Sequence, residues 1–115
     1  MYKFSYAEVL DGSLKEARER ERIAVARSIE LLKAAEAKGA DSREAVEALT
    51  YTRRLWAAFM EDLAKQENDL PKALRADLIS IGLWIMREAE DIRLGRSQDF
   101  KALIEVSSVI SEGLA

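Results

Sequence analysis

The stretch RADLISIGLWIMREAE, Arg75–Glu90, decides the fold of this chain of 115 residues. Its middle, from Leu78 to Met86, is almost continuously apolar. A helix that is apolar around most of its circumference must be surrounded by other helices or by a partner. The stretch is shorter than the roughly 20 apolar residues that cross a bilayer. It therefore predicts the enclosed central helix of a small bundle. Hydrophobic residues recur through and around it at helical spacing: Leu74, Leu78, Ile81, Ile85 and Ile92.

The composition favours one helical domain that spans residues 1–115. A single proline and five glycines leave few turns, so a few long helices are expected rather than many short strands. The lack of cysteine and histidine removes disulfides, thiolate nucleophiles, the commonest zinc ligand and the commonest general base. A net charge of −3 argues against a concentrated basic surface for nucleic acid. Because Met1–Leu10 shows no secretory signal, a cytoplasmic protein is predicted, with no membrane partner.

Hydrophobic repeats and capping signals predict four main helices, at 13–39, 41–66, 71–94 and 98–113. Gly39 is expected to end the first helix in a left-handed conformation, and Pro71 to open the third. Short connections make successive helices antiparallel. The predicted fold class is therefore an all-α, small antiparallel bundle of about four main helices. The second helix has the clearest inner stripe, with spacings of four and three residues: Ala45, Leu49, Thr52, Trp56, Phe59 and Leu63.

Residues 1–12 are predicted to form an N-terminal aromatic arm or a short helix. Tyr2, Phe4 and Tyr6 alternate along it, and Asp11-Gly12 is expected to break the chain before the first long helix. Since these aromatic residues lie outside the regular helices, contact with a partner and docking on the bundle are about equally favoured.

The last predicted helix has a stripe that includes Phe100, Leu103 and Ile110. Its β-branched residues lower its intrinsic helix propensity. We therefore expect this helix to depend on docking against the others. Trp56 and Trp84 stand at stripe positions, so core packing is favoured for both over exposure to a partner.

Paired carboxylates occur on several predicted helices, at Glu16/Glu19, Glu44/Glu47 and Glu88/Asp91. Di-iron bundles use such pairs together with histidine, which this chain lacks. Arginine or lysine stands beside most of these acids, so solvated helix faces are favoured over a metal site. No serine of the last helix has a base adjacent in sequence to activate it. No catalytic residue, metal or cofactor is therefore predicted.

Several segments of the chain resemble the FlaF family of bacterial flagellar biosynthesis proteins. The most specific is LRADLISIGLWIMREAE, and the match in the last helix is looser. The resemblance implies a cytoplasmic, non-enzymatic factor that binds flagellin and couples its synthesis to export, as a secretion chaperone or regulator. It also implies an alternative, post-transcriptional control of flagellin mRNA, directly or through the FlbT protein. The segments are YKFSYAEVL (2–10), residues 17–22, RSIELL (27–32), SREAVEAL (42–49), RRLW (53–56) and residues 70–90.

The working hypothesis is that flagellin binds to apolar surface left beside the central helix. Direct RNA binding would instead need a basic face built from Arg53, Arg54, Lys72 and Arg75. Homodimerisation that completes the core is a third alternative. The candidate contacts for flagellin are the aromatic residues of the N-terminal arm and the stripe of the last helix: Tyr2, Phe4, Tyr6, Phe100, Leu103 and Ile110.

Overall fold

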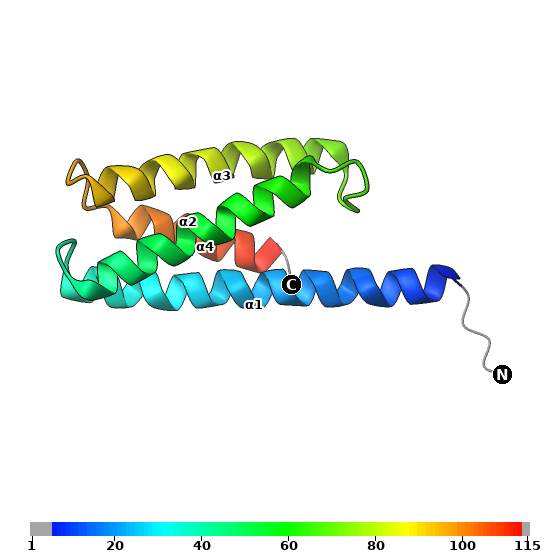
Figure 1. Cartoon of the computed structure of the whole chain (residues 1–115), viewed down its shortest axis with the longest axis horizontal. Coiled ribbons are helices and arrows are strands. Elements are labelled where there is room, and N and C mark those ends of the chain that lie inside the picture. Colours follow the sequence, from blue (N-terminus) through cyan, green and yellow to red (C-terminus); the bar gives the residue numbers. More distant parts are fainter. Residues whose placement is uncertain (1–5, 114–115) are drawn as a thin grey trace.

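The computed structural model describes the backbone of residues 6–113 and the side chains of residues 15–113. It holds four helices that alternate in direction: α1 (Tyr6–Lys38), α2 (Arg43–Ala64), α3 (Lys72–Arg93) and α4 (Phe100–Gly113) (Figure 1). Close contacts join α1 to α2 and α4, and α2 to α3, so that α1 and α3 occupy opposite corners of the bundle. The predicted all-α antiparallel bundle is confirmed.

Helix α1 is longer than the sequence suggested. It begins at Tyr6 and continues through Asp11-Gly12, so the predicted break at that dipeptide is wrong. A glycine inside a helix costs only about 1 kcal/mol relative to alanine, which a long helix can tolerate. With 33 residues, against 22 in α2, the N-terminal end of α1 extends past the other helices (Figure 1).

The turns between helices follow the local chemistry of their residues. Gly39 has φ +97°, a left-handed conformation that a glycine adopts without strain, and its position confirms the predicted end of α1. Ser42 then caps α2, because its Oγ accepts a hydrogen bond from the Ala45 backbone N–H at 3.0 Å. Pro71 directly precedes α3, and Gly95, with φ +77°, follows its end. These short turns keep successive helices side by side.

The inner stripe of α2 forms the centre of the core. Every residue predicted for it is buried, and the Trp56 side chain is completely enclosed. The rings of Trp56 and Phe59 lie with centroids 5.2 Å apart. Leu32 of α1, Ile85 of α3 and Leu103 of α4 are also fully buried in this cluster. All four helices therefore share one core.

Gly82 explains how closely α3 approaches α2. A Cβ atom at this position would lie 2.6 Å from Met60 Sδ and 2.9 Å from Trp56 Cε3. Both distances are shorter than atoms can occupy without a shift of the surroundings. The absence of a side chain at Gly82 therefore allows the rigid indole of Trp56 to pack directly against the backbone of α3.

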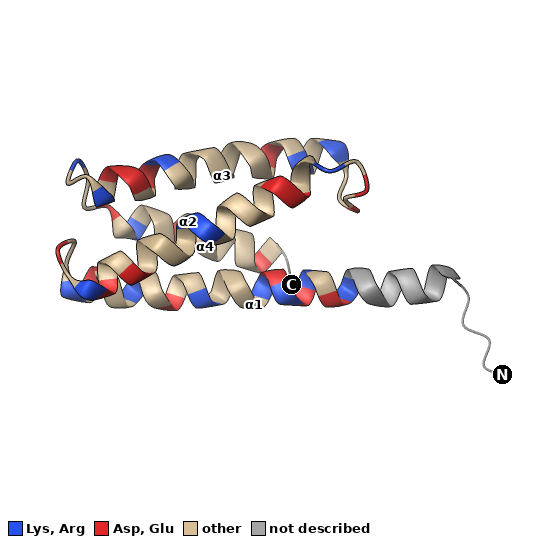
Figure 2. Ribbon diagram, viewed as in Figure 1, with Lys and Arg blue, Asp and Glu red and all other residues tan. Residues whose placement is uncertain are grey.

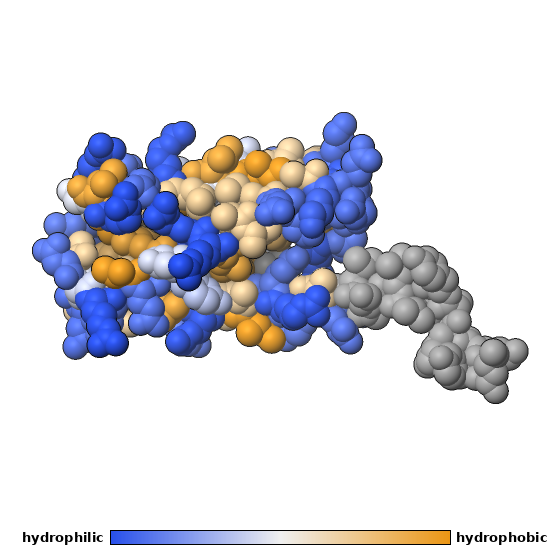
Figure 3. All heavy atoms as spheres, viewed as in Figure 1, coloured by the Kyte–Doolittle hydropathy of each residue, from blue (hydrophilic) through white to orange (hydrophobic). Residues whose placement is uncertain are grey.

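The outer side of α3 is not enclosed, contrary to the prediction of a surrounded central helix. Leu83 is 57% exposed and Trp84 is 37% exposed, so the prediction that Trp84 lies in the core is wrong. Figure 3 shows hydrophobic residues along α3 on the face in view. The reason is geometric. Helix α1 lies diagonally opposite, and α4 is eight residues shorter than α3, so it cannot cover the whole of α3.

In the part of the chain that the structure describes, none of the helices has the length and hydropathy required to span a bilayer.

Candidate partner-binding groove

A groove of about 560 Å³ lies where α3 and α4 diverge. The residues that line it are mostly apolar, and most come from the N-terminal half of α3 and the C-terminal end of α4. They are Leu74, Asp77, Leu78 and Ile81 of α3, Val109, Ile110 and Gly113 of α4, Asp69 and Leu70 of the preceding loop, and Arg18 of α1.

The groove exists because α4 does not run the full length of α3. At a rise of 1.5 Å per residue, a difference of eight residues leaves about 12 Å of α3 that the described part of α4 does not reach. Helix α4 packs mainly against α1 and makes little contact with α3. The two helices therefore leave a seam that narrows toward their connection and opens toward Leu74.

The groove has a buried floor and exposed apolar edges. Leu78 and Ile110 are buried, whereas Leu74 is 43% exposed and Val109 is 66% exposed. Trp84 follows Ile81 by three positions, so it lies one turn further along the same side of α3. Exposed hydrophobic side chains beside a concave seam mark a place where an apolar partner surface can be buried.

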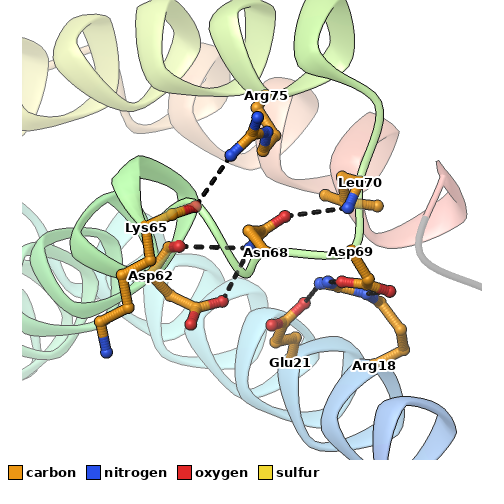
Figure 4. A network of polar contacts seen from close by, with 8 residues as sticks. All are labelled: Arg18, Glu21, Asp62, Lys65, Asn68, Asp69, Leu70 and Arg75. Atoms are coloured by element: carbon orange, nitrogen blue, oxygen red, sulfur yellow. Dashed lines mark hydrogen bonds and ion pairs between the residues drawn. The ribbon is translucent and has the colours of Figure 1, made fainter. Parts of the chain in front are cut away.

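Polar contacts hold the loop between α2 and α3 at one end of the groove (Figure 4). Arg18 of α1 forms ion pairs with Glu21 on its own helix and with Asp69 in the loop. The Nε atom of Arg18 also donates to Asp69 Oδ2 at 3.3 Å. Partial burial raises the pKa of Glu21, while the neighbouring charge of Arg18 opposes this shift. These contacts fasten the loop to α1.

Within the same loop, the side chain of Asn68 bridges Asp62 of α2 and the backbone of Leu70. Its Nδ2 donates to Asp62 Oδ2 at 3.0 Å, and its Oδ1 accepts from the Leu70 backbone N–H at 3.0 Å. From α3, Arg75 Nη1 donates to the Lys65 carbonyl oxygen at 2.8 Å (Figure 4). The loop is thus tied to both helices that it connects, and Leu70 is held against the end of the groove.

Of the predicted contact residues whose side chains the structure describes, only Ile110 lines this groove. Tyr2 and Phe4 lie outside the described residues, as does the side chain of Tyr6. Phe100 and Leu103 are buried in the core, and Ile110 forms part of the groove floor. Contact of a partner with Phe100 or Leu103 would require α4 to leave the bundle, so their role stays a prediction.

Sequence reasoning missed the exposed edges of the groove, Leu74 and Val109. The signal that could have found them was helix length. The last helix, predicted at 98–113, is shorter than the one predicted at 71–94, so part of the longer helix had to remain uncovered. The apolar face of α3 that extends past the end of the shorter helix is therefore exposed.

The basic residues considered for RNA binding do not lie together. Arg53 pairs with Glu90 at 3.3 Å, whereas Arg75 and Lys72 lie toward the other end of α3, about 22 Å and about 27 Å from Glu90 along the helix. Figure 2 shows acidic and basic residues interspersed over the bundle. Over the described residues, positive charge is therefore dispersed rather than gathered into one surface.

The paired carboxylates are likewise not assembled into a metal site. Among the residues described, no three acidic side chains come together in a group able to hold a metal ion. The exposed Glu19 and the half-buried Glu90 instead have lowered pKa values, chiefly because each accepts a hydrogen bond from an arginine one turn away.

Comparison with known proteins agrees with the resemblance noted in the sequence. A family model described as “Flagellar protein FlaF” matches residues 2–114, a range that includes all four helices and the groove. Comparisons with curated proteins and with solved structures gave no significant match. Because the family model covers nearly the whole chain, the protein belongs to the FlaF family of flagellar proteins.

Proposed function

We propose that this protein is a non-enzymatic flagellum-assembly factor that binds flagellin in the cytoplasm through the groove between α3 and α4. By holding an amphipathic helix of flagellin, it couples flagellin synthesis to export. Membership of a flagellar family supports the biological context. The single observation that carries the binding mode is the open apolar seam edged by Leu74 and Val109.

The dimensions of the groove support a helix as the bound element. The α3 side of the groove extends from Leu74 to Ile81, over seven residues or about 10 Å. A partner helix of about two turns would match this length. Recognition of this kind places apolar side chains at helical spacing into a hydrophobic groove. The bound helix would then complete the side of the bundle that α4 leaves open.

A pair of valines provides a matched test of this site. Val109 edges the groove and Val46 lies on α2 away from it, yet both are 66% exposed. We expect Val109→Asp to weaken the binding of purified flagellin at least about tenfold, because a carboxylate would replace an apolar contact in the interface. Val46→Asp should bind as the wild type does. Isothermal titration measures both affinities, and circular dichroism confirms that both variants are folded.

Equal binding by Val109→Asp and the wild type would remove the groove from the proposal. A variant with Tyr2, Phe4 and Tyr6 all changed to alanine provides a separate test of the N-terminal aromatic residues. If that variant loses binding while Val109→Asp keeps it, the partner surface lies at the N-terminus instead.

A further inference from the structure

The charges around the groove indicate what kind of helix it accepts. Asp77 lies on the α3 side of the groove and is exposed. On α4, Glu105 and Glu112 are exposed and stand four positions before and three positions after Val109, so they flank it on the same side of the helix. Within residues 15–113, the structure gives none of these three carboxylates an ion pair.

The positive charge at the groove is already neutralised. Arg18 is the cation among the lining residues, and it is paired with both Glu21 and Asp69. Lys101 lies one turn before Glu105, toward the connection between α3 and α4 and away from the open end. The apolar floor therefore has Asp77 on its α3 edge, and Glu105 and Glu112 stand beside Val109 on its α4 edge, with no ion-pair partner for any of them among residues 15–113.

We infer that the groove selects an amphipathic helix whose apolar stripe is flanked on both sides by lysine or arginine. Such a helix would place its cations next to Asp77 on one edge and Glu105 and Glu112 on the other. Acidic flanks would meet like charges, which disfavours binding. This inference rests on the proposed function, because it specifies the chemistry of the helix that the same groove would hold.

Two synthetic peptides test the charge requirement directly. Each has about 18 residues, enough to become helical when bound, and both carry the same leucine stripe. One has lysine on both flanks and the other has glutamate. We expect the full-length protein to bind the lysine peptide more tightly than the glutamate peptide, by at least about tenfold at low salt, and to lose most of this difference as salt is added.

Variants of the protein then show which carboxylates cause the difference in affinity between the two peptides. The triple variant Asp77→Asn, Glu105→Gln, Glu112→Gln should weaken binding of the lysine peptide about tenfold, since each exposed charge pair contributes modestly. The control variant changes three other exposed acids: Glu36→Gln, Glu47→Gln and Glu61→Gln. Because it has the same net charge as the first variant, it separates the position of the charges from their number. If position matters, the control variant should bind the lysine peptide as tightly as the wild type does.

Three results would overturn the inference. The two peptides could bind equally, the control variant could weaken binding as much as the groove variant, or sedimentation could show a dimer that Val109→Asp dissociates. The last result would make a second copy of this chain the occupant of the groove. If the peptides bind equally while Val109→Asp still abolishes flagellin binding, the proposed function stands and only the charge preference fails.

Discussion

The two sides of α3 differ in how they meet their neighbours. Toward α2, the missing side chain of Gly82 allows Trp56 and Met60 to pack against the helix backbone, and both helices contain 22 residues. Toward α4, a helix of 14 residues leaves Leu74 and Val109 exposed. The tight seam between α2 and α3 therefore supplies stability, whereas the loose seam between α3 and α4 leaves apolar surface available for binding.

The largest expected effect is a difference in the free energy of unfolding between alanine variants of the two tryptophans. Trp56→Ala should lower the free energy of unfolding by about 3–5 kcal/mol, because it leaves a large cavity in the tightly packed seam. Trp84→Ala should cost less than about 1 kcal/mol, because Trp84 is partly exposed beside the loose seam. Urea denaturation followed by circular dichroism measures both changes. Equal losses in the two variants would contradict the described difference between the seams.

A second prediction concerns the close approach of α2 and α3. Gly82→Ala should lower the free energy of unfolding by about 1–3 kcal/mol, since the added methyl group collides with Trp56 and Met60. Gly113→Ala serves as the control, because its Cβ would meet no described atom within 4 Å apart from its chain neighbours and its own helix backbone. The control should be neutral or slightly stabilising. Stabilisation by Gly82→Ala in the same denaturation assay would show that the helices are further apart than described.

The third prediction compares two fully buried serines. Ser107 Oγ of α4 has no hydrogen-bond partner among the described residues, whereas Ser28 Oγ of α1 donates to the Val25 carbonyl oxygen at 2.6 Å. Removing an unsatisfied buried hydroxyl relieves a desolvation cost, so Ser107→Ala should stabilise the protein by about 1 kcal/mol. Ser28→Ala should not stabilise it. Urea denaturation measures both variants. If the two substitutions shifted the denaturation midpoint in the same direction, the result would contradict the different surroundings of the two hydroxyl groups.

The smallest expected effect is a pH dependence at Glu21, beside the loop at the end of the groove. Because burial raises its pKa, the folded state holds the proton more tightly than the unfolded chain, and Glu21 lowers stability as the pH rises above 4.5 through the folded pKa. Glutamine cannot titrate. The free energy of unfolding of Glu21→Gln, relative to wild type, should therefore rise across that interval.

Glu19 provides the control for the sign of this effect. Its pKa is lowered, chiefly by the hydrogen bond from Arg22, so the ionised form stabilises the folded state. This contribution is present above pH 4.5 and is lost as the pH falls through the folded pKa. Glu19→Gln should therefore give the opposite slope to Glu21→Gln. Slopes of the same sign would contradict the contrast between burial at Glu21 and hydrogen bonding at Glu19.

The sequence predicted the elements whose signals are local. The inner stripe of α2 and the left-handed Gly39 depend on residues within a few positions of one another, and both were found as expected. The fold class followed from the same signals and from the short turns. Local periodicity and capping were therefore sufficient for the bundle.

The orientation of α3 could not be predicted in this way. Its apolar residues lie around most of the helix, so periodicity does not show which side faces the core. Trp84 has helical spacing from Ile81, but its exposure depends on where α4 ends, which is a property of the assembled bundle. The groove could be recognised only after the helix lengths were compared in space.

Hydrogen exchange of the full-length protein, with and without purified flagellin, tests the central claim most directly. If the groove between α3 and α4 holds the partner, exchange should slow in the segments around residues 74–84 and 105–113, while the seam between α1 and α2 stays unchanged. Slowing confined to the α1–α2 seam, with no change along α3 and α4, would contradict the account.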